Sequence, residues 1–293
     1  MSVPTLDEWR ARGQQMLVGR HQVFYIDTGG DKPPLLLLHG YPTSSYDFQR
    51  ALPALAARYR VIVHDHLGFG LSDKPREYSY SLMEQADIAL ELWRALAVET
   101  ADIVAHDYGT SVATELLARR ERGLLPIEMR SLTLSNGSVH IELAKLRVIQ
   151  RLLRQPTIGP MVARFGNYPL FRRNIRNLFA DRSFLPEAEL QVMWQGLIAN
   201  GGRTTLAHVS RYLDERHRYW HRWIGALRTT DAPINVVWAT EDPVAVLAIG
   251  RAIHEESRRS RLRLLPGVGH FPMIEAADTW TDAVLTSIDQ SRA

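Results

Sequence analysis

The Ala-His-Asp-Tyr-Gly segment at residues 105–109 constrains the fold of this chain more than any other stretch of its 293 residues. An apolar run over residues 103–105 leads into it, and a helix-like stretch over 110–117 follows it. A small residue two positions before and a glycine two positions after a central residue are typical of a sharp turn from a strand into a helix. Such a turn exposes its central side chain above a sheet, so we expect Asp107 to project there.

Short apolar runs alternate with helix-length segments along most of the chain. The runs predicted as strands cover residues 35–38, 61–63, 103–105, 132–134, 234–238 and 262–265, with a hairpin over 14–27 before them. Apolar residues spaced by three and four indicate helices over 82–96 and around 112–117. This alternation predicts an α/β fold with a mostly parallel sheet and helices on both of its faces.

The alternation stops near Gly137. Residues 139–225 are predicted to be nearly all helical, and strand-like runs resume only at Pro233. We expect this insertion to cover the carboxyl ends of the strands, where an open α/β sheet binds its ligands. The predicted domains are therefore a core, residues 1–138 and 226–293, and a helical cap, residues 139–225.

The composition excludes several kinds of chemistry and predicts a location. The chain has no cysteine, which excludes disulfides, a cysteine nucleophile and cysteine-ligated zinc. We predict no metal and no organic cofactor, because neither a ligand cluster nor a glycine-rich phosphate loop is visible. The charged N-terminus lacks the apolar segment of a signal peptide, and no apolar run approaches the roughly 20 residues that span a bilayer. We therefore expect a cytoplasmic protein.

The basic residues are interpreted as ordinary surface. The formal net charge is +3, and the excess lies in arginines between residues 147 and 222. We interpret them as interleaved with acidic residues on solvated helix faces, which predicts that neither nucleic acid nor a membrane is a partner. The oligomeric state stays open, with a homodimer as one alternative.

A His-Gly-Tyr-Pro turn at residues 39–42 directly follows the first buried strand. Such a turn would aim the backbone N–H of Tyr41 into the site, where together with the N–H of Tyr108 it would form an oxyanion hole. The alternative is a plain turn at a strand end.

Two further polar residues follow later strands. Asp242 comes after a run that ends at residue 240, with Glu241 competing for the same role, and His270 lies in a glycine-rich segment after the last strand. The order nucleophile, acid, histidine is the chain order of α/β-hydrolase triads, so we predict a triad of Asp107, Asp242 and His270. The alternatives are a helix N-cap, a surface acid and a structural histidine.

An aspartate at the turn changes the chemistry from that of a serine esterase. No Gly-x-Ser-x-Gly motif occurs in the chain. A carboxylate can displace a leaving group at a saturated carbon and leave an alkyl ester on the enzyme. The first hypothesis is therefore a hydrolase that works through an aspartyl ester of Asp107.

Several segments resemble one family over nearly the whole chain. Residues 39–45 and 65–75 resemble the Asp-nucleophile branch of the α/β-hydrolase fold, which contains epoxide hydrolases and haloalkane dehalogenases. Residues 106–109 with 115–117, and 222–227, are most similar to the mesoderm-specific transcript-like group. The resemblance implies a central sheet with an inserted helical cap, Asp107 as nucleophile, and Asp242 with His270 as the pair that activates water.

The leaving group separates the two activities of this branch. Dehalogenases typically hold the halide with indole N–H groups, one directly after the nucleophile, where this chain has Tyr108. Some add an Asn after the His-Gly pair, where Tyr41 stands, and one subgroup takes its acid from the position of Asn136. These departures weigh against halide release, although epoxide hydrolases also commonly carry Trp after the nucleophile.

Epoxide opening requires a proton donor for the alkoxide. A tyrosine suits this role because its pKa of about 10 keeps the proton in place at neutral pH. Family epoxide hydrolases use cap tyrosines, and here we rank Tyr212 first, Tyr168 second and Tyr219 third. His39 and Trp194 are predicted substrate contacts.

The predicted function is conversion of a small hydrophobic epoxide, or a related electrophile, to a vicinal diol. His270 is expected to act as a neutral base, so turnover should fall as the pH drops through its pKa, ordinarily near 6.5. The alternatives are a haloalkane dehalogenase, a lactone or ester hydrolase, and a non-catalytic binding relative.

Overall fold

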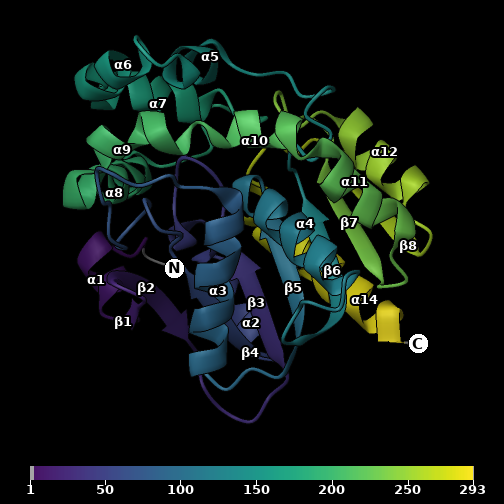
Figure 1. The fold of residues 1–293 in the computed structure, drawn as a ribbon. Helices are drawn as coiled ribbons and strands as arrows, with labels where there is room; N and C mark the ends of the chain where they lie inside the picture. Colours follow the sequence, from purple (N-terminus) through teal and green to yellow (C-terminus); the bar gives the residue numbers. More distant parts are fainter. Residues whose placement is uncertain (1–2, 293) are drawn as a thin grey trace.

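The computed structural model describes residues 3–292 and has an eight-stranded sheet at its centre (Figure 1). The spatial order of the strands is β1-β2-β4-β3-β5-β6-β7-β8. β2 pairs antiparallel with β1 and β4, and all other neighbours are parallel. The bounds are β1 (Gln14–Val18), β2 (His21–Asp27), β3 (Pro34–Leu38), β4 (Arg60–His64), β5 (Thr100–His106), β6 (Glu128–Ser135), β7 (Ile234–Ala239) and β8 (Ser260–Leu265). Every predicted strand is confirmed, as is the mostly parallel α/β fold.

The central strands are continuous apolar runs because both faces of the sheet are covered. In β3, Leu36 and Leu38 join the hydrophobic core on one face, while Leu35 and Leu37 join the core on the other. All four side chains are fully buried. The alternation follows from the twofold repeat of a strand, which sends successive side chains to opposite faces.

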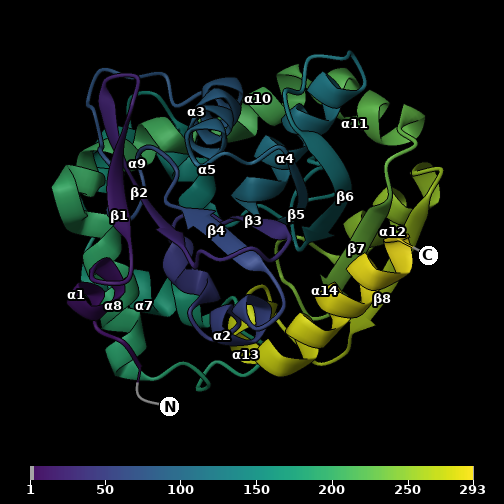
Figure 2. The ribbon, with the colours of Figure 1, turned by 90° about the horizontal axis from the view of Figure 1, so that it is seen from below.

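Helices cover each face of the sheet, as seen from below in Figure 2. One face packs against α3 (Leu82–Ala95), α4 (Tyr108–Arg120), α11 (Trp220–Thr229) and α12 (Leu247–Glu256). The other packs against α2 (Leu52–Ala56), α13 (Pro272–Glu275) and α14 (Ala277–Arg292). The short helices α1 (Leu6–Arg10) and η1 (Ser45–Phe48) lie in the N-terminal part of the chain.

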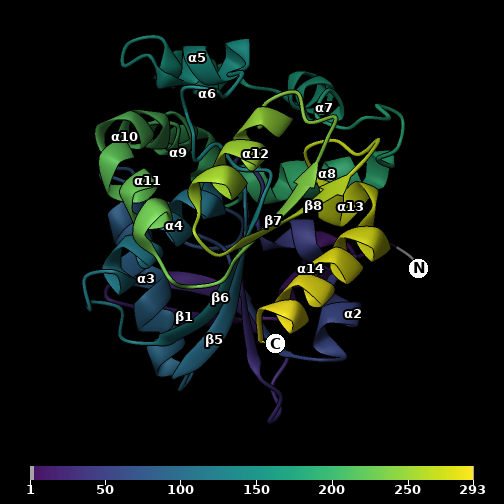
Figure 3. The same cartoon turned by 90° about the vertical axis from the view of Figure 1, so that its right-hand side faces the viewer.

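The segment between β6 and β7 is helical and gathers beyond one end of the sheet (Figures 1 and 3). Its elements before α11 are α5 (Val148–Arg154), α6 (Gly159–Phe165), α7 (Tyr168–Arg176), α8 (Glu187–Ile198), η2 (Ala199–Gly201), α9 (Gly202–Val209) and α10 (Tyr212–Arg218). The cap boundary predicted at residues 225 and 226 falls inside α11, a helix that packs on α4 of the core. None of the described helices is long and apolar enough to cross a membrane.

A buried carboxylate joins α11 to α4. Glu115 accepts hydrogen bonds from Arg119 Nε at 2.9 Å, Arg222 Nε at 2.6 Å and Trp223 Nε1 at 2.9 Å. Burial disfavours the charged form of Glu115, but these hydrogen bonds outweigh burial and lower its pKa. The carboxylate is therefore ionised in the folded protein and fixes where the cap chain returns to the core.

Replacing Glu115 with Ala should lower the free energy of unfolding by about 3 kcal/mol, because the substitution leaves partly buried donors without their acceptor. Urea unfolding measures this change. Glu128→Ala is the matched control, since Glu128 is exposed and its side chain makes no contact of this kind among the described residues. The control should stay within about 0.5 kcal/mol of the native protein, and equal losses in both variants would contradict the proposed joint.

Candidate active site

Asp107 occupies a strained turn between β5 and α4. Its φ of 45° and ψ of −107° lie outside the regions that L-residues ordinarily adopt. The turn fits only because its neighbours are glycines: a Cβ on Gly109 would lie 2.4 Å from the carbonyl oxygen of Leu38, and one on Gly40 would lie 2.9 Å from the Cβ of Asp107. The predicted strand-to-helix turn is therefore present. A glycine is required two residues after the aspartate because any side chain there would clash with β3.

The carboxylate of Asp107 is held by the main chain of the His-Gly turn. Oδ1 accepts a hydrogen bond from the N–H of Tyr41 at 2.8 Å. Asp107 stands at the N-cap position of α4, yet its side chain makes no capping hydrogen bond, so the N-cap alternative is wrong. Tyr108 is the first residue of α4, where an N–H has no partner within the helix. That N–H stays a predicted oxyanion donor.

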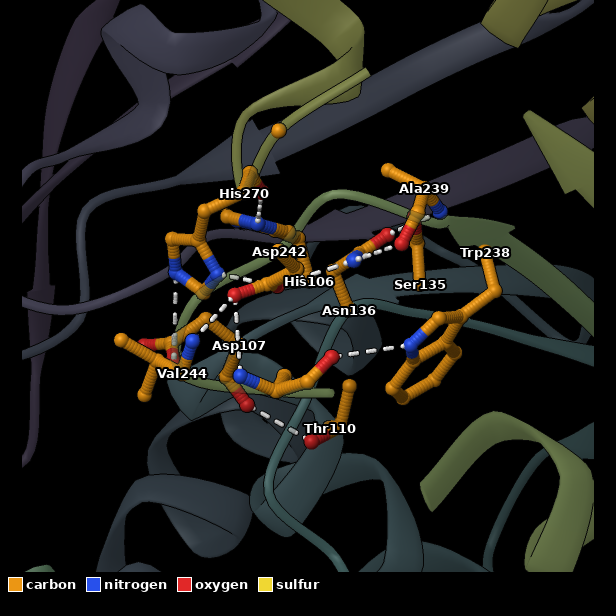
Figure 4. Close-up of polar contacts among 12 residues, drawn as sticks. His106, Asp107, Thr110, Ser135, Asn136, Trp238, Ala239, Asp242, Val244 and His270 are labelled. Carbon is orange, nitrogen blue, oxygen red and sulfur yellow. Dashed lines mark hydrogen bonds and ion pairs between the residues drawn. The ribbon is translucent and has the colours of Figure 1, made fainter. Parts of the chain in front are cut away.

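His270 lies between two carboxylates (Figure 4). Its Nδ1 is 2.7 Å from Asp242 Oδ2, and its Nε2 is 3.7 Å from Asp107 Oδ2. The other oxygen of Asp242 accepts from the N–H groups of Val244 and Ala245 at 2.7 and 2.9 Å. The competing acid, Glu241, is exposed and faces Thr240 instead. The geometry brings Asp107, His270 and Asp242 together in the predicted order.

Asn136 completes the environment of the acid. Its side-chain N–H group donates to Asp242 Oδ2 at 2.9 Å, and its Oδ1 accepts from the N–H of Ala239 at 2.9 Å (Figure 4). Asn136, which stands where one dehalogenase subgroup has its acid, thus orients the carboxylate of Asp242, which follows the neighbouring strand β7.

The charges around His270 shift its pKa upward. Burial favours the neutral imidazole, but the carboxylates of Asp242 and Asp107 outweigh burial and raise the pKa of His270 to about 9. Burial alone would raise the pKa of Asp242, and contacts with His270 reverse this so that its pKa is lowered. The value near 6.5 expected for an unperturbed imidazole therefore does not apply to this site: with a pKa of about 9, His270 is protonated at neutral pH.

The three candidate tyrosines take different positions. Tyr212, at the start of α10, is 2% exposed and, like the other two tyrosines, is not part of the pocket lining. Its hydroxyl forms no hydrogen bond of normal geometry among the described residues, and the side chain of Gln150, which does line the pocket, lies beside it. Burial raises the pKa of Tyr212, and the Asp107 carboxylate adds to the increase, so the phenol keeps its proton. The prediction of Tyr168 as a proton donor is corrected. Its hydroxyl donates to Glu187 at 2.5 Å, and the residue is not part of the pocket lining. Tyr219 packs against Trp223, outside the pocket.

A cavity of about 110 Å³ opens onto the triad. Tyr41, Asp107, His270 and Trp194 are among the residues that line it, and the role of Trp194 as a substrate contact stays a prediction. The walls are mainly apolar side chains of the cap, among them Leu153, Val162, Ile175, Leu197 and Leu206.

His39 does not reach this cavity, which corrects its prediction as a substrate contact. Its Nδ1 is 2.8 Å from the carbonyl oxygen of Gly40, and its Nε2 accepts from the N–H of His66 at 3.0 Å. Burial lowers the pKa of His39 to about 4, so the ring is neutral. Its role is to shape the loop that carries the Tyr41 N–H.

Arg216 is a site residue that the sequence did not reveal. It is 1% exposed, and its guanidinium donates to Ser111 Oγ at 2.6 Å and to the carbonyl oxygen of Asp107 at 3.1 Å. The same group lies 4.5 Å above the ring of Tyr212, and no described carboxylate forms a salt bridge with it. Tyr212 and Arg216 are four residues apart on α10 and so share one helix face, which is the only signal available in the sequence.

Within residues 3–292, no group of three or more His, Cys, Asp and Glu side chains is arranged to hold a metal ion.

Residues 33–277 match the alpha/beta hydrolase fold family, and the chain belongs to this family. It is 41% identical over 286 residues to LipZ of Mycobacterium tuberculosis, a hydrolase by name, covering 98% of this chain and 99% of LipZ. It is 34% identical to the mesoderm-specific transcript homolog protein of Homo sapiens, with 93% of this chain and 84% of that protein covered. The resemblance inferred from the sequence is confirmed.

Solved structures agree on the fold. The haloalkane dehalogenase DbeA from Bradyrhizobium elkani superposes with a TM-score of 0.82 at 23% identity, covering 96% of this chain and 98% of DbeA. At this identity the likeness establishes the architecture and not the reaction. The protein is a hydrolase of the α/β-hydrolase fold.

The raised pKa of His270 makes stability depend on pH. A pKa of about 9 in the folded protein, against about 6.5 unfolded, contributes roughly 3 kcal/mol that is fully present below pH 6.5. That contribution is lost as the pH rises through about 9. Urea unfolding between pH 6 and 10 should show this fall in the native protein and not in His270→Gln. Parallel pH dependences in the two proteins would rule out the raised pKa.

Proposed function

We propose that this protein is an epoxide hydrolase that works through an ester of Asp107. The observation that carries the proposal is the position of Tyr212: its phenol is buried directly behind the pocket lining, its ring centroid is 5.5 Å from that of the lining residue Tyr41, and the charge of Asp107 acts on its pKa. A buried donor left unpaired is unfavourable by about 1–3 kcal/mol, so the Tyr212 hydroxyl would gain free energy by donating to a substrate oxygen. The ring-opening oxygen of an epoxide is an acceptor that fits this donor.

In the first half-reaction, a carboxylate oxygen of Asp107 attacks a ring carbon. A carbon–oxygen ester bond forms as the ring C–O bond breaks, and the departing oxygen takes the proton of Tyr212. The Tyr41 N–H at 2.8 Å keeps the carboxylate in its attacking orientation. Transfer of the His270 proton to the phenolate, directly or through water, then restores Tyr212 and leaves a neutral imidazole.

In the second half-reaction, neutral His270 removes a proton from water, which attacks the ester carbonyl. Ester formation favours this step because it removes the charge of Asp107, one of the causes that raise the pKa of His270. The Tyr41 N–H stabilises the oxyanion, and loss of one such donor typically lowers the rate 10²–10³-fold. Collapse releases the diol and regenerates the Asp107 carboxylate and protonated His270, so atoms and charges balance.

Halide release has weaker support because the indole donors are used elsewhere. Trp9, Trp220, Trp223, Trp238 and Trp280 donate their N–H groups to protein acceptors. Trp93 packs on His64 away from the cavity, which leaves Trp194 as the indole in the pocket lining. The residue after the nucleophile is Tyr108, whose ring packs against His66 and Phe69. We therefore place a small, largely apolar epoxide first among substrates.

His270→Gln should form the ester and fail to hydrolyse it. Intact-protein mass spectrometry after mixing with an epoxide should show a gain equal to the whole epoxide mass, persisting for hours. An alkyl halide would instead add its mass minus HX. Asp107→Asn in the same background is the control and should gain no mass. If His270→Gln gains no mass with epoxides, halides or lactones, the ester mechanism is wrong.

Tyr212→Phe should lower kcat for epoxide hydrolysis about 10²–10⁴-fold, the usual contribution of a positioned general acid. It should leave stability nearly unchanged, because the lost hydroxyl has no partner among the described residues. Tyr168→Phe and Tyr219→Phe are matched controls and should retain native kcat. Steady-state kinetics with thermal unfolding separates the two effects, and a native kcat in Tyr212→Phe would remove this tyrosine from the mechanism.

A further inference from the structure

The outer part of the cap carries an unbroken run of basic charge. Between residues 143 and 180 the chain has eight lysines and arginines and no aspartate or glutamate. The expectation that these residues are interleaved with acids is therefore wrong for this segment. Arg154, Arg172 and Arg176 pair with acids from elsewhere in the chain. Lys145, Arg147, Arg151, Arg164 and Arg173 form no salt bridge with any described residue.

The same segment holds most of the exposed large apolar side chains. Seven of the ten such residues in the described chain lie between Leu143 and Leu170. Val148 and Leu152 are four residues apart on α5, and Ile158, the N-cap of α6, is followed at spacings of three and four by Met161 and Phe165 within that helix. Helical residues at these spacings share one face, so each helix presents an apolar stripe outward. Phe165 is 73% exposed and Met161 is 61% exposed.

The inner faces of these two helices line the catalytic cavity. Ile149 and Leu153 of α5, and Val162 and Ala163 of α6, belong to the pocket lining. Gly166 and Leu170 follow α6 in the chain and also line the pocket, although Leu170 is 43% exposed. The pocket lining therefore extends to the exposed surface at Leu170, shortly after α6 in the chain. In Figures 1 and 3, α5 and α6 lie at the outer edge of the cap, away from the sheet.

We propose that this surface docks the protein onto a lipid bilayer that contains anionic lipids. We call it the cap patch and define it by Val148, Leu152, Ile158, Met161, Phe165 and Leu170, together with the unpaired basic residues beside them. Apolar stripes bordered by arginines match the boundary between acyl chains and anionic headgroups. Docking would place the cavity entrance at the bilayer surface, where an apolar epoxide would be concentrated, and this last consequence rests on the proposed function.

Charge and composition favour a bilayer over the other occupants. A second copy bound through the same patch would bring two basic surfaces together, which like-charge repulsion opposes. A nucleic acid would match the arginines but offers phosphates where the patch presents Met161 and Phe165. An anionic bilayer offers acyl chains to the apolar side chains of the cap patch and anionic headgroups to its basic side chains.

Sedimentation with lipid vesicles tests the proposal without substrate or turnover. The native protein should bind vesicles of phosphatidylcholine with phosphatidylglycerol, bind phosphatidylcholine alone much more weakly, and lose binding as salt increases. Arg151→Gln and Arg164→Gln should each weaken binding about fivefold, which corresponds to about 1 kcal/mol. Met161→Ser with Phe165→Ser should weaken it roughly tenfold or more.

Matched controls lie away from the cap. Leu17→Ser and Leu124→Ser remove exposed apolar side chains, and Arg122→Gln and Arg258→Gln remove exposed charges. All four should bind vesicles like the native protein. Hydrogen exchange of the native protein adds a readout that needs no variant: residues 147–173 should gain protection on anionic vesicles.

Several outcomes would overturn the proposal. They are failure to bind anionic vesicles, equal binding by the patch variants and the controls, and protection outside residues 147–173. Patch-dependent dimerisation without lipid, or patch-dependent binding of an oligonucleotide but not of vesicles, would assign the surface to a different partner. The mass and kinetic tests of Asp107 and Tyr212 are run without lipid, so failure of the mechanism and failure of docking are told apart.

Discussion

The strained conformation of Asp107 is the constraint on which the site depends. Holding a non-glycine residue at a φ of 45° and ψ of −107° is unfavourable by about 1–3 kcal/mol, so the surroundings must impose it. Three groups do so from different parts of the chain. Gly109 lets the helix start press against β3, Tyr41 donates to the carboxylate, and Arg216 donates to the carbonyl oxygen of Asp107. The Asp107 carboxylate is thus fixed by core and cap together.

The balance of charge at the site explains why an arginine is buried there. Asp107 and Asp242 are both surrounded by protein, and protonated His270 offsets only one of their charges. Arg216 supplies the second positive charge within the same buried region, bound through neutral oxygens and the ring of Tyr212. Esterification of Asp107 would remove one negative charge from this set, and the group whose protonation responds is His270. In the proposed mechanism, the base becomes available when an ester is present to hydrolyse.

Local sequence patterns predicted the fold and the candidate triad because these features depend on residues that are close together in the sequence. The apolar runs that became β3 to β8, the turn at Asp107 and the glycine-rich approach to His270 each depend on neighbours in sequence. The predictions for single side chains were wrong where tertiary packing determines the direction in which a side chain points. Nothing local indicates that Tyr168 would turn to Glu187, that both ring nitrogens of His39 would bind the main chain, or that Arg216 would point inward from a charged stretch. The acid-free segment was visible in the sequence, but its significance depends on which faces of α5 and α6 remain exposed.

The cap has two parts that differ in how their side chains are hydrogen-bonded to the core. Around α10 it is tied directly to the core: Ser210 contacts the Tyr41 hydroxyl at 2.8 Å, Glu215 accepts from the N–H of Leu82 at 2.7 Å, and Arg216 binds the turn at Asp107. In the described residues, side-chain hydrogen bonds from α5 and α6 reach only other cap residues, with Arg154 to Asp214 at 2.5 Å as the link to α10. Displacement of α5 and α6 would therefore change access to the cavity while Tyr212 and Asp107 keep their geometry. Under the proposed docking, a bilayer that engages the outer helices would therefore act on access to the cavity and leave the contacts of Asp107 and Tyr212 in place.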